Sequence, residues 1–353
     1  MSPENSLNLQ RKARPAPIHL IAGDPTITLL IGFIALAVVV FGILSPGSFL
    51  SMDTVKSMAF QMPELGILSL AMMVPLMSGG LNLAIIATAN LAGLVIAAVV
   101  TNLIQPSSPP LAVTGVIALA IVAGSITALA IGLATGIIVA FFRVHPILVT
   151  LGMMTLVKGI AIVTTRGTVI GGFPPAILFI GNGTVLGIPA SMILFVLCAI
   201  AVAMILSHTP FGVAVRMIGS NERATRYSGV DTERVLVGVY ALSSLLCCVA
   251  ALVMMARFNS ARAGYAESYL LITILASVLG GVDPFGGFGK VLGLLLSLLL
   301  LQAISTGFNL LGFSPHLTEA IWGATLILAI LIALIRDRWL AQSQKPRAVT
   351  TES

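Results

Sequence analysis

Long apolar stretches alternate with short polar segments along almost the whole chain. The apolar stretches lie near residues 27–45, 58–78, 82–104, 111–141, 146–165, 190–207, 235–256, 268–282, 287–311 and 317–335. A helix needs about 20 apolar residues to cross the hydrocarbon core of a bilayer. The pattern therefore predicts an all-α polytopic membrane protein with about ten transmembrane helices. The eighth stretch is short, and the fourth is long enough to tilt in the bilayer.

The composition agrees with a membrane-embedded chain and excludes an ordinary soluble fold. Of the 353 residues, 58% are hydrophobic and only 8% are charged, and the mean hydropathy is +1.09. Soluble domains are about 25% charged. The cysteines lie in apolar stretches and the histidines are isolated, so we expect no disulfide framework and no metal site.

The basic residues between the apolar stretches predict the orientation of the chain. With the N-terminus in the cytoplasm and strict alternation, 13 of the 18 basic residues fall on the cytoplasmic side. Lys and Arg concentrate in cytoplasmic loops, so both termini are predicted to be cytoplasmic, and the net charge of +6 needs no nucleic-acid partner. We therefore divide the chain into a cytoplasmic tail over 1–26, a transmembrane domain over 27–338 that includes the cytoplasmic segment 207–234, and a second cytoplasmic tail over 339–353.

Two loops differ from simple connections. The outer loop 166–189 contains an apolar stretch, Pro175–Ile180, that is too short to span, and we expect a half-helix or a membrane-surface segment there. The other loop, 207–234, is the only long polar segment between the first and last apolar stretches; we call it the polar segment. Our orientation puts the polar segment in the cytoplasm. Long loops in compact bundles tend to be functional.

Local signals predict a short helix inside the polar segment. Ser220 or Asn221 would cap its N-terminus, since Ser and Asn side chains accept hydrogen bonds from first-turn amides. The helix would run to about Ser228 and stop at Gly229, the residue type that most often follows a helix C-terminus.

Polar residues inside the apolar stretches are the candidates for a translocation pathway or gate, because they are costly in lipid and usually functional. They are Gln61, Glu64, Asn82, Asn90 and Lys158. Asn82 and Asn90 are eight residues apart and would share one helix face; hydrogen bonding between helices is the alternative use of both. Lys158 either snorkels to the interface or pairs with Glu64. So few charges favour a neutral substrate over ion coupling.

Two glycine pairs repeat the same pattern. Gly79 and Gly80 precede Asn82, and Gly280 and Gly281 precede Asp283. Under our topology both pairs lie at the cytoplasmic ends of helices that run the same way, so they are not partners in an inverted repeat. They form either a tight helix turn or part of an inner gate.

Enzymatic motifs are absent from the sequence. The run Gly286–Lys290 resembles a phosphate-binding loop only faintly, because the spacing before the lysine is wrong and Val291 replaces the required Ser or Thr. We predict no catalytic residues, and a partner would have to supply the energy for active transport.

Seven motifs in order resemble the ribose-type ABC importer permeases, over about residues 55 to 335. The motifs are Ser78–Leu83, Pro146–Lys158, Thr209–Gly212, Ile218–Glu222, Tyr227–Val230, Tyr240–Ser243 and Leu279–Gly293. This chain departs from the family pattern at Asn82, where Asp is usual, and at Lys158, where the usual Arg would offer bidentate hydrogen bonding.

The resemblance implies a permease subunit for a monosaccharide or related polyol in the bacterial cytoplasmic membrane, with no cofactor of its own. The implied partners are a cytoplasmic ABC ATPase whose two nucleotide-binding halves bind ATP and Mg, a periplasmic or surface substrate-binding protein, and a second permease copy or homologue. The polar segment would couple to the ATPase. The implied coupling residues are Arg216, Gly219, Asn221, Glu222, Arg223, Arg226 and Gly229.

Two alternatives remain open from the sequence. One keeps the ABC machinery and changes the cargo to a nucleoside, an amino acid or an autoinducer-type sugar derivative. The other is a secondary transporter in which Glu64 and Lys158 form an ion-linked pair, which would drive uptake by a gradient without ATP.

Overall fold

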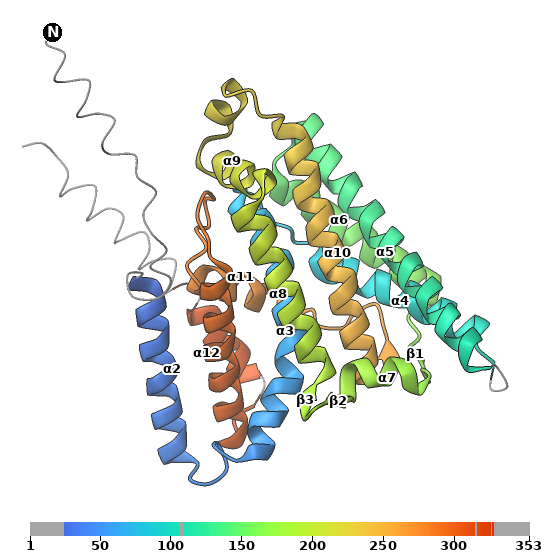
Figure 1. Cartoon of the computed structure of the whole chain (residues 1–353), viewed down its shortest axis with the longest axis vertical. Helices are drawn as coiled ribbons and strands as arrows, with labels where there is room; N and C mark the ends of the chain where they lie inside the picture. Colours follow the sequence, from blue (N-terminus) through green and yellow to red (C-terminus); the bar gives the residue numbers. More distant parts are fainter. Residues whose placement is uncertain (1–24, 106–108, 315, 326, 328–353) are drawn as a thin grey trace, which may run out of the picture.

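The structure, a computed structural model, describes residues 25–105, 109–314, 316–325 and 327. Within this part the chain is almost entirely helical (Figure 1). The helices are α2 (Pro25–Leu44), α3 (Met52–Met77), α4 (Ile85–Leu103), α5 (Pro110–Phe141), α6 (Pro146–Thr165), α7 (Pro175–Asn182), α8 (Ala190–His208), α9 (Pro210–Tyr227), α10 (Thr232–Phe258), α11 (Tyr269–Leu279) and α12 (Val291–Leu310).

The predicted polytopic helical fold is confirmed. Eight of the described helices are long and apolar enough to cross a membrane: α2, α3, α4, α5, α6, α8, α10 and α12. The short eighth stretch forms α11, which has 11 residues. The tenth stretch is described as helix only over 316–325 and at 327. The predicted tails lie outside the described residues apart from Pro25 and Thr26.

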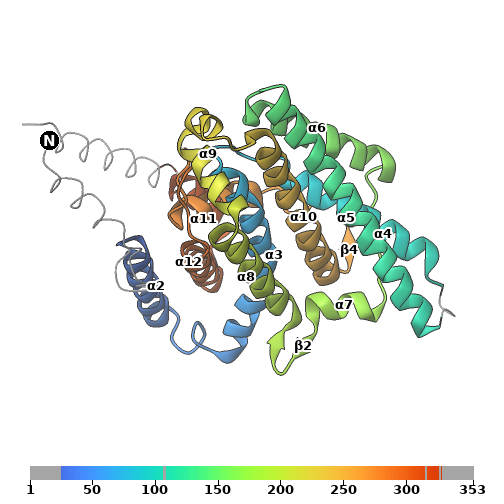
Figure 2. The same cartoon turned by 45° about the horizontal axis from the view of Figure 1, so that its top comes forward.

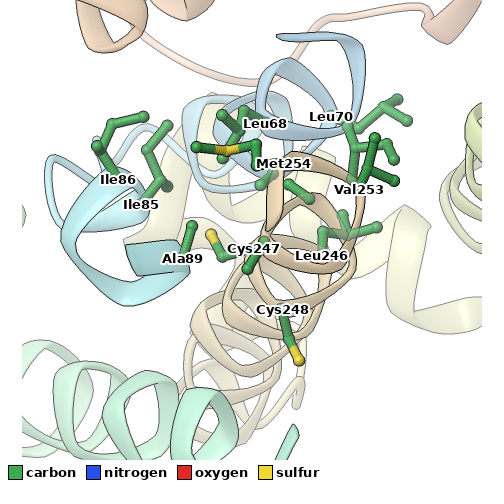
Figure 3. Close-up of a cluster of buried hydrophobic side chains, with 14 of the residues drawn as sticks. Leu68, Leu70, Ile85, Ile86, Ala89, Leu246, Cys247, Cys248, Val253 and Met254 are labelled. Atoms are coloured by element: carbon green, nitrogen blue, oxygen red, sulfur yellow. The ribbon is translucent and has the colours of Figure 1, made fainter. Parts of the chain in front are cut away.

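Helices α3 and α10 form the centre of the bundle (Figures 1 and 2). From Met62 to Met77 nearly every side chain of α3 is buried, and α10 is buried along most of its length. A helix that is apolar on all sides is expected in a protein interior. In Figure 3, Met254 of α10 lies between side chains of α3 and α4, and Cys247 points toward Ala89 of α4, whereas Cys248 points away from both helices, toward Ser125 of α5.

The other helices surround this pair. Helices α4, α5 and α6 lie on one side of α10, and α11 and α12 lie on the opposite side of α3 (Figure 2). Helix α2 packs on the outer side of α12 through an aromatic contact between Phe41 and Phe308, whose ring centroids are 5.8 Å apart. Many side chains of α2, α5 and α6 are exposed, as expected for helices that face lipid.

The loop after α6 forms a short helix, α7, over the stretch predicted to be a half-helix or a membrane-surface segment, and it packs on the end of α10. The Asn182 side chain donates to the Ala256 carbonyl at 3.0 Å. Two short antiparallel pairs flank α7. They are β1 (Ile170–Gly171) with β4 (Ser260–Ala261), and β2 (Thr184–Val185) with β3 (Ile188–Pro189).

Helix α10 connects two opposite ends of the molecule. We call them the α9 end and the α7 end, after the helix that packs at each. Figure 1 shows α9 at the top and α7 with β2 and β3 at the bottom. The breaks between α3 and α4 and between α11 and α12 both lie at the α9 end, because α9 contacts the end of α3 and the loop before α12.

Candidate translocation and coupling site

The segment 78–84 between α3 and α4, which we call the break, begins with a glycine helix cap. Gly79 has φ +81°, and the Gly80 amide donates to the Pro75 carbonyl at 3.0 Å. A left-handed residue followed by this long backward hydrogen bond is the usual glycine end of a helix. The second glycine pair repeats it: Gly281 has φ +82°, and the Val282 amide donates to Ser277 at 3.0 Å. Both pairs therefore form tight helix turns.

Asn82 holds the break against the centre of the bundle. Its side-chain amide donates to the Ser243 hydroxyl on α10 at 3.0 Å, and its carbonyl oxygen accepts from the Ala84 amide at 3.1 Å. Asn82 precedes α4, which begins at Ile85. Our expectation that Asn82 and Asn90 share one face of a helix is wrong, because the glycine cap delays the start of α4. Asn82 instead has the alternative role considered above, a hydrogen bond to a neighbouring helix.

Three main-chain segments meet at the foot of the break. They are Met77–Gly79, Gly219 of α9, and Gly286 with Gly287, and we call this contact the glycine junction. The Gly287 amide donates to the Met77 carbonyl at 2.9 Å. A Cβ on Gly219 would overlap that carbonyl oxygen, and a Cβ on Gly286 would lie 2.6 Å from the Gly79 nitrogen. Only glycine permits so close an approach.

Helix α9 consists of two parts separated at Asn221, where the backbone leaves the helical region (φ −165°, ψ 98°). The Asn221 side chain accepts from the Ala224 amide at 3.0 Å, and Gly229 follows the second part with φ +83°. The predicted cap and stop are therefore confirmed. The first part, Pro210–Ser220, is a helix that the sequence analysis did not predict; Thr209 caps it by accepting from the Gly212 amide at 3.3 Å.

The second part of α9 is tied to the start of α10 by charges. Arg226 lies 3.3 Å from Glu222 and 2.8 Å from Glu233. It also donates to the Thr232 hydroxyl at 3.1 Å. Arg223 is exposed on the same part of the helix. Arg216, in the first part, instead donates to the Leu206 carbonyl at the end of α8.

A cavity of about 230 Å³ lies on the side of the break that faces the α7 end, and we call it the outer cavity. Asn90, Lys158 and Glu267 are among its lining residues. Lys158 forms an ion pair with Glu267 at 2.7 Å, and the two side chains are 43% and 53% exposed. The Asn90 amide donates to the carbonyls of Ala263 and Tyr265, both at 3.0 Å, which holds the loop after α10 inside the bundle.

Glu64 has a different partner from the one considered above. Its Oε1 accepts from Arg257 at 2.7 Å and from the Tyr269 hydroxyl at 2.8 Å. Glu64 is 1% exposed and the Arg257 side chain 22%. The possible Glu64–Lys158 pair is therefore wrong: Glu64 pairs with Arg257 in the last turn of α10, and Lys158 pairs with Glu267 in the connection between α10 and α11. This also removes the ion-linked pair on which a secondary transporter would depend.

A second cavity, of about 410 Å³, lies at the α9 end of the break, and we call it the inner cavity. It combines polar side chains from the break, the α5–α6 loop, α9 and α10; among its lining residues are Ser78, Gly80, Arg143, Glu222 and Tyr240. Tyr240 is fully buried, and its hydroxyl lies against Gly80: a Cβ there would be 2.7 Å from it. Within the described residues this hydroxyl has no hydrogen-bond partner in the protein.

The two cavities share one face of α6. Pro146 lines the inner cavity, and Met154 and Lys158 line the outer one. Thr150 lies between them, and residues spaced by four share a helix face. The Thr150 hydroxyl is 3.1 Å from the Leu81 carbonyl and 2.9 Å from the Pro146 carbonyl. The break and α6 therefore touch at the level that separates the cavities.

The remaining candidates lie away from both cavities. Gln61 on α3 donates to the Ser57 hydroxyl at 2.9 Å and accepts from Gln302 on α12 at 3.3 Å. Asp283 shapes its own loop by accepting from the Phe285 amide at 2.8 Å. Gly280 touches the first turn of α12 at Gly293. These residues join helices or form turns. No group of three or more His, Cys, Asp or Glu side chains able to hold a metal occurs among the described residues.

Comparison with known proteins gives the family. The family described as "Branched-chain amino acid transport system / permease component" matches residues 54–330, well over half of the chain. The chain belongs to this permease family. The family resemblance predicted from the sequence is confirmed.

The permease is similar to importers of two named solutes. It is 31% identical over 297 residues to the ribose import permease protein RbsC of Bacillus subtilis (strain 168), covering 84% of this chain and 88% of that one. It is 30% identical over 273 residues to the autoinducer 2 import system permease protein LsrD of Yersinia enterocolitica, covering 76% and 79%. LsrD of Photorhabdus laumondii is 28% identical over 308 residues, covering 86% and 89%. No solved structure matches the chain.

The molecule is therefore the permease component of an ABC importer and not itself an enzyme. It is a multi-pass membrane protein, homologous to permeases of the bacterial inner membrane.

Proposed function

We propose that this permease forms the transmembrane pathway of an ATP-driven importer for a monosaccharide, a related polyol or a sugar derivative. The names of the relatives support this cargo class, since ribose and autoinducer 2 are small polar solutes. The lining of the outer cavity suits such a cargo, because it combines an amide, an ammonium group and a carboxylate with apolar side chains. Few convergent polar groups in an apolar pocket are typical of small-molecule sites.

The observation that carries the proposal is the glycine junction. It connects α9, the helix of the polar segment, to the break, and the break lies between the two cavities. A movement of α9 would therefore reach the break directly. The break also contacts α6 at Thr150 and α10 at Ser243. We infer that cargo passes along the shared face of α6 and that the contact between Thr150 and Leu81 closes the way between the cavities.

The distribution of basic residues supports a cytoplasmic α9 end. Helix connectivity assigns the following to the α9 end: Arg143, Arg216, Arg223, Arg226, Arg234 and Lys290. The α7 end has Lys56, Arg166, Arg257 and Arg262. Cytoplasmic loops are enriched in Lys and Arg. We therefore assign α9 to the cytoplasm, where an ATPase can reach it.

The proposed complex has three further components. An ABC ATPase with two nucleotide-binding halves, which binds ATP and Mg, docks on the exposed part of α9, where Tyr227 is 92% exposed beside Arg223. A substrate-binding protein delivers cargo at the α7 end. A second copy or homologue of the permease completes the pathway beside the lipid-facing helices.

The experiment reconstitutes the permease with its ATPase and binding protein in liposomes. Asn221→Ala removes the cap of the second part of α9, and Glu222→Ala removes a partner of Arg226. Both variants are expected to insert normally and to lose cargo-stimulated ATP hydrolysis and uptake. Arg234→Ala is the matched control, because Arg234 is on the same side of the protein and forms its ion pair with nearby Asp231, three residues away. Normal uptake and ATP hydrolysis in both α9 variants would refute the coupling role.

The cargo is tested separately. The solute that co-purifies with the partner binding protein is identified, and its uptake by the reconstituted complex is measured. A monosaccharide, polyol or sugar derivative supports the proposed class, whereas an amino acid or nucleoside overturns it and leaves the coupling result unchanged.

A further inference from the structure

A further large cavity lies outside the proposed pathway, between α2, α8, α9 and α12. Its volume is about 780 Å³. Helix α2 packs chiefly on α12 (Figure 2), and the cavity is lined by residues of α2, α8, α9, α12 and the loop before α12. The lining side chains of the cavity are basic at the α9 end and apolar along the helices.

The basic part of this cavity lies where three membrane-spanning helices begin or end. His208 is the last residue of α8, Lys290 immediately precedes α12, and Thr26 lies at the start of α2. The ends of spanning helices lie at the level of the lipid headgroups. Arg216 adds a third basic group from α9. Its Nε atom is buried without a hydrogen-bond partner in the described protein, while its Nη2 donates to the Leu206 carbonyl.

The apolar part continues from the basic part into the level of the hydrocarbon core. Met204 and Ile200 lie one and two turns along α8 from His208, and they are 54% and 50% exposed. Leu292, in the first turn of α12, is 43% exposed. An apolar channel that leads away from a basic pocket matches an acyl chain attached to an anionic headgroup.

We propose that this cavity binds a phospholipid with a phosphate-bearing anionic headgroup, such as phosphatidylglycerol or cardiolipin. His208, Arg216 and Lys290 face the headgroup, and Ile200, Met204 and Leu292 contact an acyl chain. Basic pockets between transmembrane helices bind such headgroups. A soluble phosphate fits the cavity less well, because it would leave the apolar channel empty.

The site lies beside the machinery of the proposed transport cycle. Gly287 and Gly289 line the cavity, and Gly287 belongs to the glycine junction. The bound lipid therefore contacts the loop that holds α9 to the end of α3. Lipid binding does not depend on the identity of the cargo or on the proposed function.

The test measures lipid retained by the full-length permease. The protein is purified in detergent, supplied with phosphatidylglycerol or phosphatidylcholine, and analysed by native mass spectrometry. We expect selective retention of phosphatidylglycerol, weakened at least about fivefold in the double variant His208→Ala, Lys290→Ala, since one basic residue at a lipid surface contributes about that factor. Arg234→Ala, on the same side of the protein and 86% exposed, is the control and retains the lipid.

A variant that leaves the charge unchanged distinguishes binding of the lipid acyl chain from binding of the headgroup. Ala203→Trp would fill the apolar channel, because Ala203 lines the cavity on α8, and it is expected to reduce retention as well. Thermal unfolding in detergent verifies that each variant is folded. Equal retention of both lipids, or full competition by inorganic phosphate, would overturn the proposal in favour of a nonselective groove or a free-anion site. Absence of retained lipid in the full chain would overturn it too.

Discussion

The Thr150 hydroxyl on α6 lies 3.1 Å from the carbonyl oxygen of Leu81 in the break. Thr150 is fully buried and lies between the residues of α6 that line the two cavities. If this contact holds the pathway closed, its loss has to favour an open state even without cargo.

Thr150→Val retains the shape of the side chain and removes the hydroxyl. A hydrogen bond contributes about 1 kcal/mol net, so the ratio of open to closed states should rise about fivefold. We expect a matching rise in ATP hydrolysis without binding protein, measured in liposomes with the partner ATPase. Thr155→Val on the same helix is the control, because the Thr155 hydroxyl bonds only to its own helix, at 2.8 Å from the Gly152 carbonyl. An unchanged basal rate in Thr150→Val would contradict the gate.

Gly219→Ala should disturb the coupling contact by steric overlap. The added Cβ would collide with main-chain atoms of Met77 and Gly287, which cannot rotate away as a side chain can. Overpacking of this kind costs about 1–3 kcal/mol. We expect cargo-stimulated ATP hydrolysis and uptake to fall about 30-fold, the factor that corresponds to about 2 kcal/mol, the middle of that range. Gly159→Ala on α6 has open space at its Cβ and should leave both rates unchanged.

Glu64→Ala should lower stability far more than it changes cargo preference. It would leave Arg257 and the Tyr269 hydroxyl without their shared carboxylate. Removal of one partner from a buried ion pair costs about 3–5 kcal/mol. The measurement is the free energy of unfolding in detergent. The double variant Glu64→Leu, Arg257→Leu removes both charges and should recover most of the loss. Equal stabilities of wild type and Glu64→Ala would show that the pair does not hold α3, α10 and α11 together.

The ion pair between Lys158 and Glu267 should contribute little to stability and more to uptake, the opposite of the pair formed by Glu64. Both side chains are about half exposed, and exposed ion pairs contribute about 0–1 kcal/mol to stability. Lys158→Glu should therefore leave the unfolding temperature almost unchanged, while it places two carboxylates in the outer cavity and reduces uptake several-fold. The exchanged pair, Lys158→Glu with Glu267→Lys, should restore uptake. Normal uptake in the single variant would exclude the outer cavity from the pathway.

Local chemistry determined how well the sequence predicted the site. The cap at Asn221 and the stop at Gly229 depend on neighbouring residues, and both are correct. The helix Pro210–Ser220 was missed, although Thr209 and Pro210 form a recognisable start signal, because it was grouped with the charged remainder of the polar segment. The spanning helices were likewise predicted correctly from the apolar stretches, since the length of an apolar stretch is enough to predict a transmembrane helix.

The partners of the buried charges could not be predicted in the same way. Lys158 and Glu267 are far apart in sequence, and they meet because Asn90 holds the loop after α10 inside the bundle. The sequence does contain one usable signal, since the last turn of α10 and the connection to α11 carry three charged residues: Arg257, Arg262 and Glu267. Which of these charges faces Glu64 depends on helix packing. Asn82 was misplaced for a related reason, because the glycine cap moves the start of α4 beyond it.

The glycine junction has a mechanical consequence. Side chains in contact can change rotamer and so absorb part of a displacement. At the glycine junction the contacting atoms of Gly219, Met77 and Gly287 belong to the main chain and have no such freedom. Compliance has to come from the neighbouring backbone. Asn221 interrupts α9 on one side, and Gly79 ends α3 on the other. The connection is therefore stiff at the contact itself, and bending between α9 and α3 is confined to Asn221 and Gly79.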